Sequence, residues 1–168
     1  MKLSKKVFII NGSGGVGKDT FCEYVGHYAK VKVISSIDLV KDYASKMGWN
    51  GSKTPRDRKF LSDLKDLLTK YNDYPFRDIC QKVLWFKEDD NEFLFIHIRE
   101  PEEIDRAKRE FNAHTILMVN DNVKGIYSNH ADARVLEYNY DIVVDNSGTL
   151  KDLEIIAKDF VEKWRNKR

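Results

Sequence analysis

Residues 6–20 read KVFIINGSGGVGKDT, and this stretch determines the fold class. The apolar run Val7–Ile10 is typical of a strand that is buried on both faces. A glycine-rich turn follows directly, and Lys18, Asp19 and Thr20 then open an apolar pattern at helical spacing. A strand, a glycine loop and a helix in this order predict the beginning of an α/β domain.

The loop matches the pattern G-x-x-x-x-G-K at Gly12, Gly17 and Lys18. Glycines let backbone N–H groups approach phosphate oxygens, and a helix amino terminus adds partial positive charge. Lys18 supplies an ammonium group for the β- and γ-phosphates of a nucleotide. The alternative is a glycine-rich turn with a chance lysine. We expect the following residues to bind ATP: Gly12, Ser13, Gly14, Gly15, Val16, Gly17, Lys18, Asp19 and Thr20.

The residue after Lys18 departs from the usual pattern, in which a Ser or Thr hydroxyl holds magnesium. Asp19 stands there, and a carboxylate beside a triphosphate would be repelled unless it binds or orients hydrated Mg²⁺. Asp19 is therefore a candidate ligand of Mg²⁺. Its simpler role is that of a carboxylate in the first turn of a helix, where negative charge is favourable.

Apolar runs alternate with helical patterns along the rest of the chain, which predicts a three-layer α/β fold. The further predicted strands are Val31–Ile34, Phe93–Ile98, Thr115–Val119 and Asp141–Val144. The length of 168 residues fits one domain over residues 1–168, since a domain averages roughly 150 residues. At the end of the chain, Thr149 and Asp152 resemble a capping box that begins the last helix.

The interval between the second and third strands has no strand pattern and predicts a helical insertion over about residues 37–90. Helices are expected around Ile37–Met47, Asp57–Tyr71 and Phe76–Phe86. The second of these carries an apolar stripe made of Phe60, Leu61, Leu64, Leu67, Leu68 and Tyr71. The insertion should lie over the carboxyl ends of the strands, where α/β proteins bind ligands.

Composition excludes several classes of protein. The net charge is +2 and both signs are spread along the chain, so no nucleic-acid partner is expected. The two cysteines, Cys22 and Cys80, cannot form a disulfide framework and indicate a reducing compartment. No stretch approaches the roughly 18 apolar residues that span a membrane. We therefore expect a soluble, cytoplasmic protein that contacts no membrane, with its oligomeric state left open.

Four segments together resemble deoxynucleoside monophosphate kinases and their relatives, the dephospho-CoA and phosphomevalonate kinases. The ending G-K-D-T resembles their P-loop, and residues 48–61 (GWNGSKTPRDRKFL) resemble a stretch that leads into a substrate-side helix. Residues 95–103 (FIHIREPEE) resemble a strand that ends in an arginine facing the acceptor phosphate. Residues 140–150 (YDIVVDNSGTL) are similar to the last strand and turn of that group, a turn that borders adenine.

The resemblance implies a P-loop kinase fold with a five-stranded parallel sheet, a helical acceptor-binding insertion and a short mobile lid at about residues 120–134. It also implies ATP and Mg²⁺ as donor and a phosphorylated small molecule as acceptor. Two positions depart from it. His97 stands where relatives often carry an aspartate, with Glu100 as a candidate replacement in orienting Mg²⁺, and the lid region Asn120–Ala133 holds Lys124 as its one cation.

Arginine side chains are the candidates for holding the acceptor phosphate, because their planar forks bind such oxygens in pairs. They are Arg56, Arg58 and Arg99. The alternative for Arg99 is a salt bridge to Glu102 or Glu103. For Arg56 and Arg58 the alternative is a solvated side chain at the start of a helix. The sequence does not say which of these two arginines contacts the substrate.

Asp38 follows the second strand, where it could accept a hydrogen bond from the acceptor, help to place magnesium, or simply begin a helix. The candidate catalytic residues are thus Lys18, Arg99 and Asp38. His97 lies in an apolar strand and is expected to be a satisfied core histidine. Three aromatic residues of the insertion could stack on a base or simply pack, namely Tyr43, Trp49 and Tyr74.

These residues favour an ATP-dependent kinase acting on a nucleoside or deoxynucleoside monophosphate. Dephospho-CoA and phosphomevalonate are the alternative acceptors. A GTPase-like switch is disfavoured, because the guanine-reading motif N-K-x-D does not occur in the sequence. A third possibility is a non-catalytic module that binds ATP without transferring phosphate.

Overall fold

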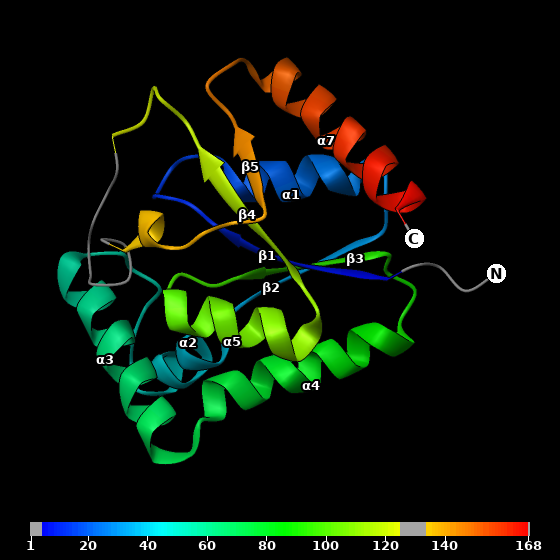
Figure 1. Cartoon of the computed structure of the whole chain (residues 1–168). Coiled ribbons are helices and arrows are strands. Elements are labelled where there is room, and N and C mark those ends of the chain that lie inside the picture. Colours follow the sequence, from blue (N-terminus) through cyan, green and yellow to red (C-terminus); the bar gives the residue numbers. More distant parts are fainter. Residues whose placement is uncertain (1–4, 125–133, 168) are drawn as a thin grey trace.

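Five parallel strands form one sheet in the computed structural model, which describes residues 5–124 and 134–167 (Figure 1). The strands are β1 (Lys6–Asn11), β2 (Val31–Ser35), β3 (Phe93–His97), β4 (His114–Val119) and β5 (Ile142–Asp145). They stand in the order β2-β3-β1-β4-β5. The central strand β1 pairs Ile9 with Ile96 of β3 and with Thr115 of β4. The predicted five-stranded parallel sheet is therefore confirmed.

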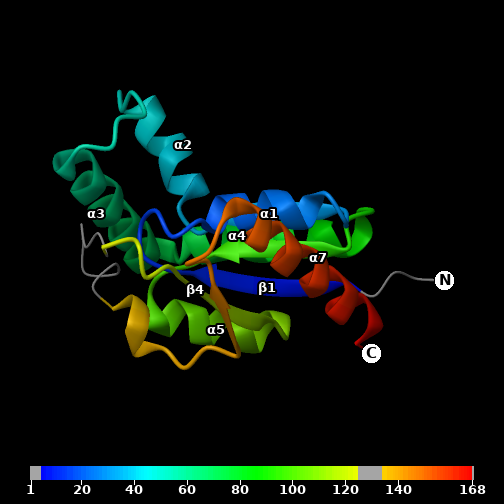
Figure 2. The ribbon, with the colours of Figure 1, turned by 90° about the horizontal axis from the view of Figure 1, so that it is seen from above.

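Helices cover both faces of the sheet and make the predicted third layer (Figures 1 and 2). They are α1 (Lys18–Gly26), α2 (Asp38–Lys46), α3 (Pro55–Asn72), α4 (Tyr74–Glu88), α5 (Pro101–Phe111) and α7 (Leu150–Asn166), with a 3-10 turn η1 (Val135–Glu137). α1 and α7 lie on one face, whereas α4 and α5 lie on the other. None of the helices described has the length and apolar character needed to cross a membrane.

Alternating side chains of β1 divide the core into two halves. Phe8 points toward α1 and α7 and is fully buried against Phe95 and Phe160, at ring-centroid distances of 5.3 and 4.9 Å. Ile9 points the other way and belongs to the apolar cluster of α4 and α5, which includes Ile104. Because successive side chains of a strand face opposite sides, a strand covered on both faces must be apolar throughout.

Capping boxes fix the first turns of α3 and α7. The hydroxyl of Thr54 accepts from the backbone N–H of Asp57, whose carboxylate binds back to the N–H of Thr54. Thr149 and Asp152 make the same reciprocal pair at the start of α7, as the sequence predicts. Each box satisfies donors that a helix start otherwise leaves without partners.

The apolar stripe expected on α3 is only partly buried. Leu67 is 63% exposed and Tyr71 is 81% exposed, whereas the residue of α3 that the structure buries is Lys65. The reason is the position of the helix. Figure 2 shows α2 and α3 projecting beyond the ends of the strands, so α3 packs on α2 and α4 instead of covering the sheet.

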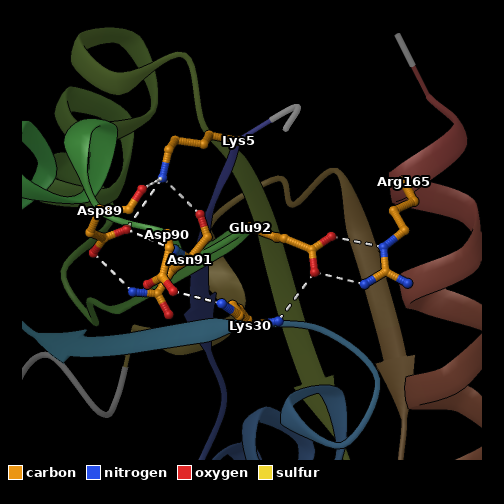
Figure 3. A network of polar contacts seen from close by, with 7 residues as sticks. All are labelled: Lys5, Lys30, Asp89, Asp90, Asn91, Glu92 and Arg165. Carbon is orange, nitrogen blue, oxygen red and sulfur yellow. Dashed lines mark hydrogen bonds and ion pairs between the residues drawn. The ribbon is translucent and has the colours of Figure 1, made fainter. Parts of the chain in front are cut away.

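A polar network closes the edge at which the strands begin (Figure 3). Lys5 donates to the backbone carbonyls of Asp89 and Asn91 at 2.7 and 2.8 Å. Arg165, near the end of α7, binds Glu92 through two hydrogen bonds of 2.8 and 2.7 Å. These contacts join the starts of β1 and β3 to α7. The opposite edge, at which the strands end, is called the carboxyl edge below.

The insertion expected at about residues 37–90 corresponds to α2, α3 and α4. Its helices begin and end within a few residues of the predicted ranges. The lid expected at about residues 120–134 falls largely on residues 125–133, which lie outside the described part of the chain. The division of the chain into one domain with an insertion and a lid stays a prediction.

Candidate functional site

A cavity of about 590 Å³ opens at the carboxyl edge, between the glycine loop and the insertion. It lies beside the end of β1, which stands between β3, on the side of β2, and β4, on the side of β5, so that successive connections run to opposite sides of β1. Such switch points are the usual ligand sites of α/β sheets. The polar residues around it include Lys18, Asp19, Ser36, Asp38, Arg58, Lys65, His97, Arg99 and Glu100.

The glycines of the loop have a conformation that excludes side chains. Gly12 and Gly17 have φ angles of 155° and 98°, which L-residues rarely adopt. A Cβ atom on Gly12 would lie 2.6 Å from the carbonyl oxygen of Met118, and one on Gly17 would collide with the side-chain amide of Asn146. The amide of Asn146 instead donates to the carbonyl of Val16 at 2.9 Å. The loop is thus packed against β4 and the turn after β5.

Lys18 lies over this loop. Its Nζ donates to the carbonyl oxygens of Gly12 and Ser13 at 2.7 and 3.1 Å. The ammonium group therefore lies close to the loop whose N–H groups and helix start favour an anion. This arrangement places a cation where phosphate oxygens would bind.

Asn11 is a positioning residue that the sequence analysis missed. It is buried at the end of β1, and its side-chain oxygen accepts from the N–H of Gly12 at 2.9 Å. Its amide nitrogen donates to the carbonyl of Arg99 at 3.2 Å and to the hydroxyl of Tyr140 at 2.9 Å. Asn11 thus connects the loop to the end of β3. A polar residue that directly follows an apolar strand was the signal available in the sequence.

Asp19 and His97 meet at the mouth of the loop. The Asp19 side chain is 99% exposed, and its Oδ1 lies 3.7 Å from the Nε2 of His97. Nε2 is buried and has no hydrogen-bond partner among the residues described. The expectation of a satisfied core histidine is therefore wrong. His97 is the last residue of β3 and lines the cavity. Burial lowers the pKa of its imidazole, although the nearby Asp19 carboxylate acts in the opposite direction.

The donor set at the loop fits a magnesium ion that arrives with a nucleotide. Nowhere in residues 5–124 and 134–167 do three or more His, Cys, Asp or Glu side chains gather as a metal site. Mg²⁺ in nucleotide sites keeps several waters and phosphate oxygens, and it needs only one or two carboxylates from the protein. The exposed carboxylate of Asp19, one residue from Lys18, suits that requirement.

The three candidate arginines separate in the structure. Arg58 and Arg99 line the cavity, whereas Arg56 lies on the exposed start of α3 outside it. Two residues along a helix differ by about 200° in direction, which explains the difference between Arg56 and Arg58. The glutamates weighed as partners of Arg99 bind other cations: Glu102 pairs with Arg134, and Glu103 pairs with Lys65.

Asp38 lines the cavity and also has a structural bond. Its Oδ2 accepts from the backbone N–H of Ser35 at 2.8 Å, which holds the carboxylate against the end of β2. Of the three aromatic candidates, Trp49 alone is among the residues that line this cavity, and its indole N–H donates to the carbonyl of Ser52 at 3.0 Å. Tyr43 and Tyr74 pack on each other, with ring centroids 6.1 Å apart.

A buried ion cluster lies beside the cavity, and three of its members, Ser36, Lys65 and Glu100, line it. The Nζ of Lys65 binds Glu103 at 2.6 Å, Glu100 at 2.9 Å and the hydroxyl of Ser36 at 3.2 Å. Burial raises the pKa of Glu103 to about 7, because the neighbouring ammonium does not fully offset its desolvation. Burial opposes the charge of Lys65 as well, but the two carboxylates outweigh it and raise the pKa of the lysine. The spacing of apolar residues in the sequence does not predict this cluster.

The far side of the loop is bordered by two connected turns. The hydroxyl of Ser147 accepts from the N–H of Asp121 at 2.9 Å, and its carbonyl accepts from the amide of Asn122 at 2.8 Å. The turn at Asp145–Gly148 therefore lies beside both the loop after β4 and the glycine loop. This is the region in which the resemblance places the adenine.

Comparisons with known proteins agree on the fold. The chain is similar to the structure of TT1252 from Thermus thermophilus, with a TM-score of 0.56 and 16% identity over 95% of this chain and 97% of that one. It is also similar to thymidylate kinase from Candida albicans, with a TM-score of 0.51 and 14% identity over 99% and 95%. No protein-family model and no curated protein matches the sequence. The chain thus has the P-loop kinase fold.

Proposed function

We propose that this protein is an ATP-dependent kinase that transfers a phosphoryl group to a phosphorylated small molecule. One observation carries the proposal: a single cavity is lined by the glycine loop with Lys18 and also by Arg58 and Arg99. Phosphoryl transfer needs two phosphate groups held in line and their charge neutralised. Three cations around one cavity, Lys18, Arg58 and Arg99, could supply that neutralisation.

The residues of the loop bind the donor in this proposal. Their backbone N–H groups and the start of α1 hold the phosphates of ATP, and Thr20 supplies its hydroxyl and N–H to the α-phosphate. Lys18 leaves the carbonyls of Gly12 and Ser13 to bind the β- and γ-phosphates. Asp19 is the protein carboxylate for Mg²⁺, which when bound neutralises charge on the phosphates.

Arg99 and Arg58 hold the acceptor phosphate. The side chain of Asn11 donates to the carbonyl of Arg99 and accepts from the N–H of Gly12. One side chain therefore connects the ATP-binding loop to the backbone of Arg99. Asp38, fixed by Ser35, is the carboxylate that accepts a hydrogen bond from the acceptor.

We favour a nucleoside or deoxynucleoside monophosphate as the acceptor. Trp49 and Leu61 of the insertion add an aromatic and an aliphatic side chain to the lining of the cavity. A planar base would stack on such side chains, whereas phosphomevalonate has no ring to place there. Dephospho-CoA carries an adenine ring and is the second acceptor to be tested.

The experiment is a coupled assay of ADP release with ATP and Mg²⁺. The panel contains the nucleoside and deoxynucleoside monophosphates, dephospho-CoA and phosphomevalonate. Acceptor-dependent ADP from one of them, lost in Lys18→Ala and retained in Arg56→Ala, would support the kinase and name its acceptor. ATP binding without acceptor-dependent ADP across this panel would favour the non-catalytic ATP-binding module instead.

A further inference from the structure

The Nε2 atom of His97 is a buried polar group without a partner in the described part of the chain. Nearly all such groups in native proteins are hydrogen-bonded, so an exception calls for a partner such as an ion, a ligand, a water or a neighbouring group that moves. The His97 side chain is 16% exposed and lines the same cavity as Lys18 and Arg99. Its unpaired nitrogen therefore needs a partner that arrives with the ligand or moves in response to it.

Asp19 is the group in position to become that partner. Its Oδ1 lies 3.7 Å from Nε2, beyond hydrogen-bond distance but within the reach of a side-chain rotation. The carboxylate is 99% exposed, which leaves it room to rotate, whereas the imidazole is held at the end of β3. A rotation of Asp19 would thus complete the pair without any movement of the sheet.

The carboxylate also needs such a partner. Asp19 lies next to Lys18 in the first turn of α1, where the phosphates of a nucleotide would repel it if nothing held it in place. A ligating carboxylate is commonly fixed by a second group that donates a hydrogen bond to it, and this group orients it toward the metal. An imidazole has a ring N–H that can donate such a bond, and His97 presents the nitrogen nearest to the carboxylate.

We propose that His97 is a positioning residue for the magnesium-nucleotide complex. When the nucleotide and its metal are bound, Nε2–H donates to the Asp19 carboxylate and holds it toward the metal. This inference rests on the proposed function for the presence of that complex. It assigns to His97 a role that differs from core packing and from contact with the acceptor.

The test measures binding of ADP by calorimetry, with Mg²⁺ and with EDTA, so that no acceptor is involved. His97→Leu removes the donor and keeps a side chain of similar bulk. Loss of a group that orients a metal ligand commonly costs 10- to 100-fold, so we expect affinity for Mg–ADP to fall about tenfold. Affinity for metal-free ADP should change by less than about twofold, and His97→Gln, which keeps an N–H donor, should recover most of the loss.

A second pair of variants isolates the contact with Asp19. In an Asp19→Ala background, His97→Leu should have almost no further effect on Mg–ADP affinity, because the partner is already absent. The thermal midpoint and circular dichroism of each variant establish that it is folded. His97→Gln serves as the test if His97→Leu does not fold, and it should then resemble the unmodified protein in Mg–ADP affinity.

Three results would overturn the inference. An equal loss in both backgrounds would show that His97 acts without Asp19. An equal loss with Mg²⁺ and with EDTA would show a structural role, and an unmodified protein whose ADP affinity ignores Mg²⁺ would have no such complex to position. If Mg–ADP binds as expected but no acceptor is phosphorylated, the proposed kinase activity fails while the role of His97 stands.

Discussion

Replacing Lys65 with methionine should destabilise the protein strongly and more at high pH than at low pH. The substitution keeps the length of the side chain but leaves Glu100 and Glu103 facing each other without the ammonium that binds both. The side chain of Lys65 is 8% exposed, and those of the glutamates are 25% and 16% exposed. Breaking a buried ion pair on one side costs 3–5 kcal/mol, and partial exposure puts this case at about 3 kcal/mol.

The pH dependence follows from the pKa of Glu103. It is about 7 in the folded protein and higher than the ordinary value of 4.5, so the folded state keeps this proton more tightly than the unfolded state does. The free energy of unfolding therefore falls as pH rises from about 4.5 through about 7. Removing Lys65 raises the pKa of Glu103 further and also raises the pKa of Glu100, which Lys65 helps to lower. The variant should therefore lose more stability than the unmodified protein between pH 5.5 and pH 8.

Urea unfolding at these two pH values, followed by circular dichroism, measures the effect. Lys59→Met is the matched control, because Lys59 lies on the same helix and pairs with Asp63 at 2.5 Å, but its side chain is 74% exposed. This surface pair should contribute less than about 0.5 kcal/mol. A Lys65→Met loss no larger than that of Lys59→Met, or one that is equal at both pH values, would refute the reasoning.

The remaining predictions concern the loop, the start of α3 and the start of α7. Gly17→Ala should lower the free energy of unfolding by about 1–3 kcal/mol and weaken ADP binding, because φ is 98° and a Cβ atom would collide with Asn146. Unchanged ADP affinity in calorimetry would show that the loop accommodates a side chain. Arg58→Ala should raise the acceptor KM about tenfold or more, with Arg56→Ala near the unmodified value; equal effects would remove Arg58 from the acceptor site. Thr149→Ala should lower the free energy of urea unfolding by about 1 kcal/mol through its capping box, and no loss would mean that the box adds nothing.

The elements of the fold could be predicted from the sequence because local patterns determine them. The run Val7–Ile10 falls within β1, and the loop after it has the backbone that its glycines indicate. The box at Thr149 begins α7 where the sequence places it. Each of these depends on residues that are close together in the chain, which is the range over which periodicity and capping carry information.

The site was less predictable because its contacts join distant segments. The partners of Lys65 lie at the start of α5, 35 and 38 residues away, so the helical pattern alone predicts a solvated lysine. The exposure of Tyr71 on α3 could not be predicted either, because an apolar stripe in the sequence does not show whether another element packs against it. His97 looked like a core residue because it stands between Ile96 and Ile98, which are both fully buried, and the pattern does not show that its own side of the chain lines the cavity.

The position of α2 and α3 has a practical consequence for protein engineering. The excursion that contains them leaves β2 at Ser35 and rejoins the α/β framework at Tyr74, and none of the five strands lies within it. The return crossover to β3 is made by α4 alone. A substitute excursion could therefore be grafted between these two points to change the chemical selectivity of the pocket, while the nucleotide end and the sheet keep their own sequence. Lys65 is the residue such a graft must retain, since it is the ionic anchor of the excursion to Glu100 and Glu103.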